Sequence, residues 1–466
     1  MQRTLSIQTT KKIGQSVCLN GWVHSRRNLG KIVFLDLRDR WGIVQVVCVP
    51  AELDEVSARA LKDIRPEYVL EVEGQVNQRS ANQVNPDMPT GKVEVLAKKI
   101  TILAKSETPP FEIENEDRQA NEELRLKYRY LDLRHERMQK NIELRHKVIK
   151  NIREYLYDKD FLEIETPLLS KSTPEGARDF LVPSRNYPGK FYALPQSPQQ
   201  YKQLLMVAGM EKYFQIVRCF RDEDQRGDRQ AEFTQLDMEM SFIDEDEILN
   251  LAEDMVKEVI KNLGKDYKLV FDKFPKLTYE EAMEKYKSDR PDLRQDKNNK
   301  KELAFCWVTD FPMFEYKEGD KRWASTHHPF TAIKDEDLNK LGDKSKMAEI
   351  KAKQYDLVLN GSEIAGGSIR TTNPEVLHQV FQLLGYKSQE IQAKFGHLLE
   401  AFKYGVPPHG GIAFGLDRIV MILAGEDSIR EVIAFPKTSD NRDPLMNSPS
   451  EVSEEQLKEL GIKVSQ

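Results

Sequence analysis

The chain has 466 residues, of which 31% are charged, and its formal net charge at neutral pH is −6. This length and composition predict a soluble globular protein of two to four domains. No apolar run approaches the ~20 residues that a membrane-spanning helix needs, and the first residues lack the pattern of a secretory signal, so we expect no membrane partner. The four cysteines are scattered without a Cys-x-x-Cys pair, which argues against zinc and disulfides and favours a cytoplasmic location.

Charge is distributed unevenly along the chain. Residues 1–105 carry a net charge of +5 and the remainder carries −11. A small basic region attached to an acidic body hints at a nucleic-acid-binding module joined to a second functional unit.

Residues 1–105 are predicted to form a small all-β domain. Hydrophobic runs separated by turn signals indicate five strands, and a segment with helical character, Ala51–Asp63, follows the third of them. This order is typical of the OB-fold, a Greek-key barrel that binds oligonucleotides. The predicted strands are Ser16–His24, Lys31–Leu37, Gly42–Cys48, Glu67–Asn77 and Lys92–Ile102.

The first three predicted strands mix aromatic, cationic and amide side chains, a combination that suits stacking on unpaired bases and contact with phosphates. The alternative is that Trp22 and Phe34 belong to the core of the barrel. The side chains concerned are Trp22, Arg26, Arg27, Phe34, Arg38 and Gln45.

Residues 106–133 are predicted to be a linker, because adjacent prolines near their start bar a helix there. After the linker, apolar residues in 141–157 recur at helical spacing, and 161–167 has the pattern of a strand that ends at Pro167. A helix and a strand in this position suit a dimer interface, and they suit an internal core element equally well.

An antiparallel hairpin is predicted near the middle of the chain. Its strands, Tyr213–Phe220 and Glu232–Met240, are joined by about ten polar residues of both charge signs. Such a loop could clamp a planar polyanion, with arginines for phosphates and Phe233 for a ring. It could equally be a solvated surface hairpin.

The rest of the chain alternates between helical and strand patterns, so residues 134–446 are predicted to form one large α+β domain. It is expected to contain a loop near 289–305 and to be followed by a tail, 447–466. The predicted helices are 244–263, 278–287 and 418–423, and the predicted strands are 354–359 and 410–416.

Three charged sets in this domain could hold a nucleotide. Arg221 and Glu223 open the loop of the hairpin. Asp356 and Glu363 flank a strand and its turn, and paired carboxylates suit Mg²⁺. Arg418 stands at a strand-to-helix junction, where backbone N–H groups and a guanidinium can both meet phosphate.

These sets belong to longer motifs that resemble a known family. Phe220–Glu223 with Phe233, and Gly411–Arg418, are similar to motifs 2 and 3 of the class II aminoacyl-tRNA synthetases, and the helix and strand that end at Pro167 resemble motif 1. Further motifs resemble the bacterial type of aspartyl-tRNA synthetases over nearly the whole chain. These are Thr173–Phe180, Gln196–Gln199 with Lys202, His327–Thr331, Gly361–Glu363 and Ser368–Arg370.

The resemblance implies a fold class and an activity. The fold would be α+β, with an N-terminal OB-fold barrel followed by a catalytic domain built on an antiparallel sheet flanked by helices. The activity would be the ATP-dependent ligation of L-aspartate to tRNA-Asp through an aspartyl-adenylate, with Mg²⁺ as cofactor, in a homodimer.

The resemblance also implies the site residues. Arg221 and Arg418 would be catalytic. The ATP-binding residues would be Arg221, Asp222, Glu223, Gln230, Phe233, Glu363, Gly415, Leu416, Asp417 and Arg418. The aspartate-binding residues would be Glu175, Ser197, Gln199, Lys202, Arg221, Asp237, His327, His328 and Arg370. Mg²⁺ would be held by Asp356 and Glu363, and the anticodon would be read by Arg27, Phe34 and Gln45.

Charge complementarity would select the substrate. Arg370 and Lys202 would hold the side-chain carboxylate of aspartate, while Glu175, Gln199 and Asp237 would accept from its ammonium. Asparagine is expected to bind poorly, because its neutral amide would leave both cations uncompensated.

The chain departs from the family pattern in one place. Bacterial-type members usually carry a large extra domain between motif 2 and the His-His motif, whereas about twenty residues, Arg290–Asp310, occupy that gap here. Leu29 stands where members that also charge tRNA-Asn tend to have histidine, which favours strict use of tRNA-Asp. The alternatives are an asparaginyl- or lysyl-type sister enzyme, and a non-catalytic RNA-binding paralogue.

Overall fold

The computed structural model describes residues 1–113, 120–172, 176–264, 266–319, 321–343 and 345–464. It divides into two compact units, Met1–Arg125 with Tyr130–His135, and Leu126–Arg129 with Glu136–Gln466. The segment that was predicted to be a linker is partly helical, because it contains α2 (Glu122–Lys127) and α3 (Arg129–Asp132).

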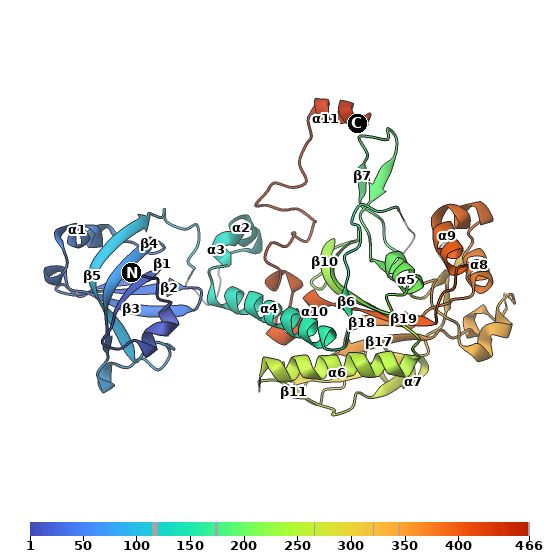
Figure 1. The fold of residues 1–466 in the computed structure, drawn as a ribbon, viewed down its shortest axis with the longest axis horizontal. Coiled ribbons are helices and arrows are strands. Elements are labelled where there is room, and N and C mark those ends of the chain that lie inside the picture. Colours follow the sequence, from blue (N-terminus) through green and yellow to red (C-terminus); the bar gives the residue numbers. More distant parts are fainter. Residues whose placement is uncertain (114–119, 173–175, 265, 320, 344, 465–466) are drawn as a thin grey trace. The chain divides into compact units, whose positions relative to one another are not determined.

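The first unit contains the predicted barrel. Five strands close in the order β1-β2-β3-β5-β4, and a helix, α1 (Glu55–Asp63), follows β3 (Figure 1). Alternate residues of each strand point inward, so that Leu35, Val46 and Val72 are fully buried. The OB-fold prediction is therefore confirmed. The strands are β1 (Ser16–Asn28), β2 (Val33–Asp39), β3 (Gly42–Cys48), β4 (Val69–Gln78) and β5 (Val93–Ala104).

The second unit is built on an eight-stranded sheet in its described part, with the order β12-β14-β17-β18-β19-β10-β9-β6. The pairs from β14 to β9 are antiparallel, as predicted, whereas β12 and β6 each run parallel to their neighbour at the two edges. The sheet is therefore mixed. Its strands are β6 (Leu162–Glu163), β9 (Lys212–Phe220), β10 (Glu232–Ser241), β12 (Lys276–Thr278), β14 (Phe305–Thr309), β17 (Gln354–Leu359), β18 (Ser362–Ile369) and β19 (His409–Gly415).

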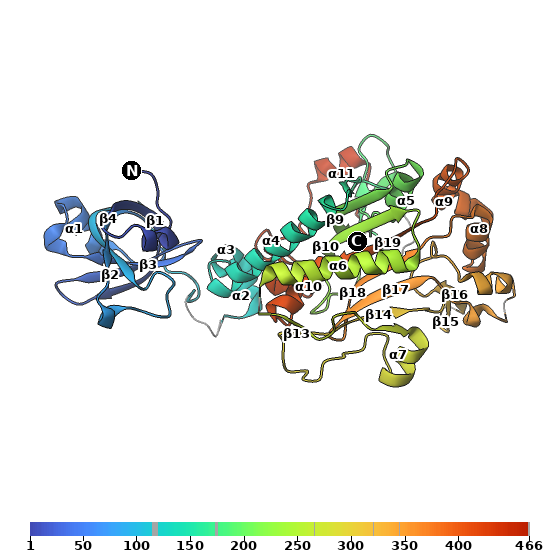
Figure 2. The ribbon, with the colours of Figure 1, turned by 60° about the horizontal axis from the view of Figure 1, so that its bottom comes forward.

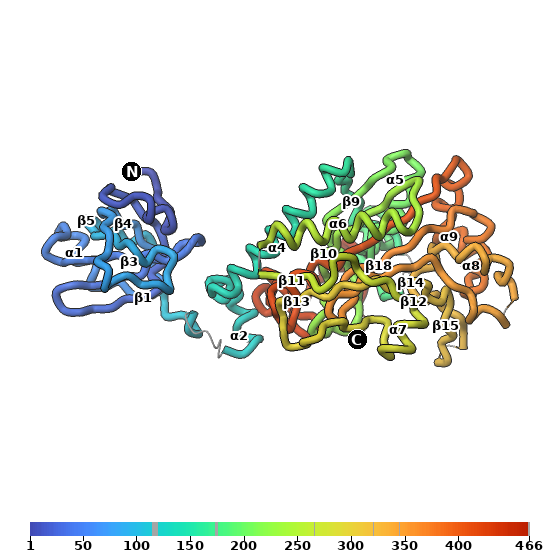
Figure 3. Tube along the Cα trace, turned by 90° about the horizontal axis from the view of Figure 1, so that it is seen from below, coloured from blue at the N-terminus to red at the C-terminus, as the bar shows by residue number. Residues whose placement is uncertain are grey.

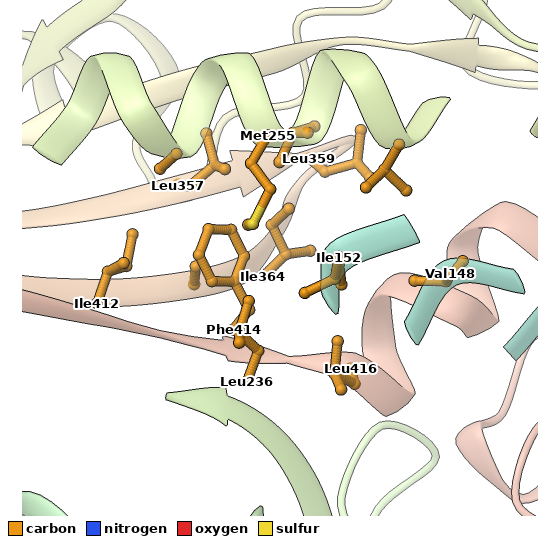
Figure 4. Close-up of a cluster of buried hydrophobic side chains, with 14 of the residues drawn as sticks. Val148, Ile152, Leu236, Met255, Leu357, Leu359, Ile364, Ile412, Phe414 and Leu416 are labelled. Carbon is orange, nitrogen blue, oxygen red and sulfur yellow. The ribbon is translucent and has the colours of Figure 1, made fainter. Parts of the chain in front are cut away.

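The two faces of this sheet differ in polarity. Leu236 and Met238 of β10 belong to the hydrophobic core. Figure 4 shows Leu236 there beside Ile412 and Phe414 of β19. The helices α4 (Glu136–Tyr157), α6 (Glu245–Leu263) and α10 (Leu416–Ala424), whose positions Figure 2 shows, also contribute side chains to this core, as do the other long strands of the sheet. Because strand residues alternate, the intervening polar residues of β10 are left on the opposite face.

Several elements differ from the prediction. The segment 161–167 contributes only the two paired residues of β6. Two helices that the sequence analysis did not predict, α8 (Pro374–Leu383) and α9 (Ser388–Phe402), pack together beside α5 (Gln199–Val207) at one end of the sheet (Figure 3). The predicted helices α6 and α7 (Tyr279–Tyr286) each begin with a capping box.

Short elements complete the second unit. The tail contains a helix, α11 (Glu454–Leu460). The remaining strands are β7 (Leu181–Pro183), β8 (Phe191–Ala193), β11 (Lys268–Leu269), β13 (Glu302–Leu303), β15 (Phe314–Lys317) and β16 (Arg322–Ser325). Within the described ranges, no helix has the length and apolar character needed to cross a membrane.

Candidate active site

Two adjoining cavities lie on the polar face of the large sheet. The first has a volume of 460 Å³ and includes Arg418 and Phe233 in its lining, and the second has a volume of 410 Å³ and includes Arg370 and Lys202. Arg221 borders both, so the structure brings the three expected arginines to one continuous site. The residues that line both cavities are Arg221, Glu223, Gln235, His327, Glu363 and Ala413.

The β9–β10 hairpin positions the centre of the site. Arg221 follows the last residue of β9, and its guanidinium carbon lies 5.0 Å from the centroid of the Phe233 ring on β10. This distance is within the range of a cation–π contact. The hairpin therefore places a cation and an aromatic ring next to each other in the first cavity.

The loop of the hairpin adds further polar groups to the first cavity. Glu223 lies 3.7 Å from Arg229, and the side-chain oxygen of Gln230 accepts a hydrogen bond from the backbone N–H of Lys437 at 2.8 Å. Asp222 is placed differently, because it pairs with Arg178 and is outside the lining of both cavities.

Arg418 lies in the first turn of α10, which begins directly after Gly415, and it lines the first cavity. It donates to the backbone oxygen of Glu363 and forms an ion pair with Asp228 at 3.0 Å. Its Nε is buried without an acceptor. The arginine is thus held in place while part of its donor capacity stays unused.

Leu416 and Asp417 lie between Gly415 and Arg418 in the sequence, and their side chains make structural contacts. Leu416 is fully buried in the core. Asp417 borders the first cavity, but one carboxylate oxygen accepts from Arg145 of α4 and the other accepts from the backbone N–H of Thr234 at 2.8 Å. Asp417 therefore joins α4, β10 and α10, and its two oxygens are already occupied.

A buried ionic network forms the floor of the second cavity. Arg370 donates from Nε and Nη2 to the two carboxylate oxygens of Glu239 at 2.9 and 3.0 Å, and from Nη1 to Ser368 at 2.8 Å. Lys202 lies 2.8 Å from Asp237 and 3.0 Å from Glu239. The four charged side chains are nearly inaccessible to solvent.

The network shifts the pKa values of its carboxyl groups in opposite directions. Burial alone would raise the pKa of Glu239, but Arg370 and Lys202 outweigh burial and lower this pKa to about 2. For Asp237, burial is the largest effect and raises the pKa above its usual value, although Lys202 opposes it. Glu239 is therefore the firmly ionised partner of the two cations.

This network corrects one expectation. The prediction that only an acidic substrate would compensate the charges of Arg370 and Lys202 is wrong. Glu239 neutralises part of their charge from within the protein, and Asp237 pairs with Lys202. Glu239 was missed, although its spacing of two from Asp237 on a strand indicated that both would share one face.

Neutral polar groups also line the second cavity. Burial lowers the pKa values of His327 and His328. His328 accepts at Nδ1 from the backbone N–H of Phe330, so its proton is on Nε2, which is buried without an acceptor. The Nε2 of Gln199 is also buried without an acceptor, and Ser197 borders the same cavity. Glu175 lies outside the described residues.

Asp356 and Glu363 converge as expected. A Cβ at Gly366 would lie 2.9 Å from Oδ1 of Asp356 and 3.5 Å from Oε1 of Glu363, so this glycine leaves open the space between the two carboxylates. Glu363 borders both cavities, whereas Asp356 is buried behind the lining. Burial and the charge of Glu363 raise the pKa of Asp356 well above its usual value, which a bound cation would reverse.

Arg27, Phe34 and Gln45, which are expected to bind nucleic acid, lie on one face of the barrel strands, and Gln45 is buried there. Arg27 is opposite Phe34 on β1 and β2, and Asp36 is opposite Gln45 on β2 and β3, all on one face. The guanidinium carbon of Arg27 lies 5.8 Å from the Phe34 ring, and this arginine also pairs with Asp36 at 3.5 Å. Arg38, in contrast, is buried and bound by Glu67 through two hydrogen bonds.

Comparison with known proteins identifies the family. A family model described as "tRNA synthetases class II (D, K and N)" matches residues 121–439, and one described as "OB-fold nucleic acid binding domain" matches residues 17–103. The asparaginyl-tRNA synthetase from Pyrococcus horikoshii, solved with asparaginyl-adenylate, superposes with a TM-score of 0.75 at 24% identity, covering 94% of this chain and 98% of that chain. This similarity supports the fold.

Two curated relatives match almost the full chain. The "Aspartate--tRNA ligase" of Staphylococcus carnosus is 41% identical over 98% of this chain and 98% of its own length. The "Aspartate--tRNA(Asp/Asn) ligase" of Caldanaerobacter subterraneus subsp. tengcongensis is 43% identical over 97% of this chain and 96% of its own length. The first alignment extends over 581 positions, so the relative carries more than 100 residues that this 466-residue chain lacks, in agreement with the expected absence of a large insert. The chain belongs to the class II aminoacyl-tRNA synthetases, in the group that the family model describes as D, K and N.

Proposed function

We propose that this protein joins L-aspartate to tRNA in two steps that consume ATP. The α-carboxylate of aspartate attacks the α-phosphorus of ATP, which forms aspartyl-adenylate and releases pyrophosphate. The aspartyl group then moves to the terminal adenosine of the tRNA and AMP leaves. The names of the two relatives support this function, and the observation that carries it is the pair of cavities that meet at Arg221.

No protein nucleophile is required for this chemistry, so catalysis consists of positioning and charge stabilisation. Arg221 borders both cavities, where the carboxylate of one substrate and the α-phosphate of the other would meet, and its charge would stabilise the transition state. Phe233 and Glu223 would hold the adenine in the first cavity.

Arg418 would bind the γ-phosphate at the other end of the first cavity. Asp228 now occupies one side of its guanidinium. A phosphate carries more charge than this carboxylate and can bind a guanidinium through two oxygens, so we expect ATP to displace Asp228.

The donors in the second cavity favour an acidic amino acid. Arg370 uses three N–H groups on Glu239 and Ser368, which leaves two for a ligand. The Nε2 groups of Gln199 and His328 are further donors without an acceptor. Lys202 is occupied by the protein, so its role would be to position Glu239 rather than to hold the substrate by itself.

A magnesium ion would be held by Asp356 and Glu363, whose oxygens border the space above Gly366. Carboxylate oxygens are suitable ligands, and the ion would take its remaining ligands from phosphate oxygens and water. It would neutralise phosphate charge during the first step.

The barrel would read the anticodon through Arg27, Phe34 and Gln45. The relatives include enzymes named for tRNA-Asp/Asn as well as enzymes named without that extension, so the tRNA choice depends on this chain's own residues. Leu29, an exposed residue directly after β1, favours strict use of tRNA-Asp. Charging assays with tRNA-Asp and tRNA-Asn transcripts test this, and Leu29→His should extend charging to tRNA-Asn.

The proposed assembly is a homodimer in the cytoplasm. Half-exposed apolar side chains, Tyr157, Leu162 and Leu168, gather at the edge strand β6 and line a hollow of 780 Å³. Such a group of apolar side chains suits a self-complementary interface. Sedimentation analysis should give a dimer, and Leu162→Asp with Leu168→Asp should give a monomer, whereas Leu338→Asp, elsewhere in this unit, should not.

Pyrophosphate exchange with aspartate, asparagine and lysine tests the proposed function directly. We expect exchange with aspartate and at most weak exchange with the other two. Exchange driven mainly by asparagine or lysine would identify a sister enzyme, and no exchange with any of them would contradict the proposal.

A further inference from the structure

The turn between β2 and β3 carries a cluster that the proposed sites do not use. Trp41 is 44% exposed, and the guanidinium carbons of Arg40 and Arg3 lie 5.2 and 5.9 Å from its ring centroid. We propose that this Arg3–Trp41–Arg40 cluster is a second RNA-binding point, where an unpaired base stacks on the indole and the arginines bind the adjoining phosphates. The inference rests on the proposed use of tRNA.

The cluster is held in place without a ligand. Asp39 is buried and accepts from the backbone N–H and the hydroxyl of Ser6 at 2.8 and 2.6 Å, and from the backbone N–H of Trp41 at 2.8 Å. Arg3 donates to the backbone oxygen of Asn20 at 3.1 Å. The N-terminal segment and the turn are therefore fixed to each other, which reduces the entropy that a ligand must overcome.

The positive charge of the cluster favours the binding of an anion. Neither Arg3 nor Arg40 has a carboxylate ion-pair partner among the described residues, and the nearby carboxylate of Asp39 is already engaged by three hydrogen bonds. Two like charges beside one ring repel each other, and an anion between them would relieve this repulsion. Phosphodiesters match the planar donor geometry of guanidinium, and bases stack on aromatic faces. RNA is the polymer in this enzyme's proposed reaction that supplies both.

The cluster is separate from the anticodon-binding row. Phe34 and Asp39, where the turn that carries Trp41 begins, are five residues apart along β2, which corresponds to about 16 Å of extended chain. A nucleotide that stacks on Phe34 therefore cannot also reach Trp41. The cluster would contact a different nucleotide of the same tRNA and lengthen the footprint of the barrel.

Two variants of the full-length enzyme test the inference. Trp41→Ala should weaken the binding of tRNA-Asp about fivefold or more, because a base loses its stacking partner. Arg3→Ala with Arg40→Ala should reduce the slope of log K against log salt by about 1.4 to 1.8, the expected loss for two phosphate contacts. Pyrophosphate exchange without tRNA should stay unchanged in both.

The chain offers matched controls. Arg59 on α1 has a side chain that is 82% exposed and is also basic, so Arg59→Ala should leave tRNA affinity nearly unchanged. Trp41→Phe keeps an aromatic face and should restore most of the binding lost in Trp41→Ala. Nuclease protection should show the lost contacts outside the anticodon, whereas Arg27→Ala should lose protection within it.

The results separate this inference from the proposed function. If the wild-type enzyme charges tRNA-Asp, and both Trp41→Ala and the double arginine variant bind tRNA within twofold of it, the inference about the cluster is overturned. The proposed function would then still stand. Equal loss in Arg59→Ala would also overturn it, because only general charge would then matter. A wild-type enzyme that charges no tRNA would overturn the proposed function itself.

Discussion

Glu239 is the side chain on which the second cavity depends. It holds Arg370 through two hydrogen bonds and also contacts Lys202, so one carboxylate fixes the positions of two cations. In the proposed function, selectivity for aspartate would then depend on the unused N–H groups of Arg370 rather than on unpaired positive charge. A site whose donors are held in advance loses little freedom when substrate binds.

Glu239→Gln should lower the free energy of unfolding by about 3 to 5 kcal/mol at neutral pH, because the buried Arg370 loses its carboxylate partner and the buried Lys202 loses one of its two. The pKa of Glu239 is lowered from 4.5 to about 2, so its stabilising contribution is complete above pH 4.5 and is lost as pH falls towards 2. Denaturant unfolding between pH 2 and 7 should therefore show the difference between variant and wild type shrinking at low pH. Glu232→Gln, on the same strand but partly exposed beside Arg218, should change stability far less.

Arg418→Ala should reduce adenylate formation at least ~100-fold, the scale for loss of a group that stabilises developing charge. Asp228→Asn should have a much smaller effect, since it removes only the carboxylate that pairs with Arg418 before ATP binds. Pyrophosphate exchange measured at several ATP concentrations checks both. Near-normal exchange in Arg418→Ala would refute its assigned role.

At the scale of elements, β18 places a residue without a side chain, Gly366, next to two carboxylates. Gly366 lies between Asp356 of β17 and Glu363 of its own strand, and a methyl group there would lie 2.9 Å from a carboxylate oxygen. The backbone conformation of Gly366 is one that other residues also adopt. Glycine is therefore needed here because there is no space for a side chain, and not because of its conformational freedom.

Gly366→Ala should raise the Mg²⁺ concentration needed for half-maximal pyrophosphate exchange, because the added methyl group crowds the two proposed metal ligands. A titration of exchange activity with MgCl₂ measures this effect. Gly319→Ala is a suitable control, since a Cβ at that position meets no atom within 4 Å. An unchanged titration in Gly366→Ala would argue against a metal ion between these carboxylates.

The elements could be predicted from the sequence to different degrees. The hairpin strands β9 and β10 and the helix α6 lie within one or two residues of their predicted ends, because their period and caps are local signals. The helix α8 also has such signals, since Asn373 caps it and Pro374 occupies its first turn, so it could have been predicted from the sequence as well. The edge strand β6 was overpredicted, because pairing requires a neighbour that a sequence does not reveal.

At the scale of the whole molecule, the basic and acidic regions of the chain correspond to two units. The barrel is formed by the basic part of the chain, and the large sheet of the acidic part borders both cavities. This division predicts that tRNA recognition and amino-acid activation can be impaired separately.

Arg27→Ala should weaken tRNA charging while leaving pyrophosphate exchange without tRNA unchanged. The side chain of Arg27 is largely exposed on the barrel, and its loss removes one phosphate or base contact. Charging and exchange measured on the same preparation check this outcome. Equal loss of both activities would contradict the separation of functions between the units.

The sequence by itself determined the barrel, the antiparallel strands at the centre of the large sheet and many of the residues that border the cavities, because hydrophobic period, turn residues and motifs are local properties of a chain. Only the tertiary structure decided which charges pair. Glu239 meets Arg370 across 131 positions, and Asp417 meets Arg145 across 272. Such partners are chosen by the packing of strands and helices that are distant along the chain, so only the folded structure shows that the charges beside the second cavity are paired.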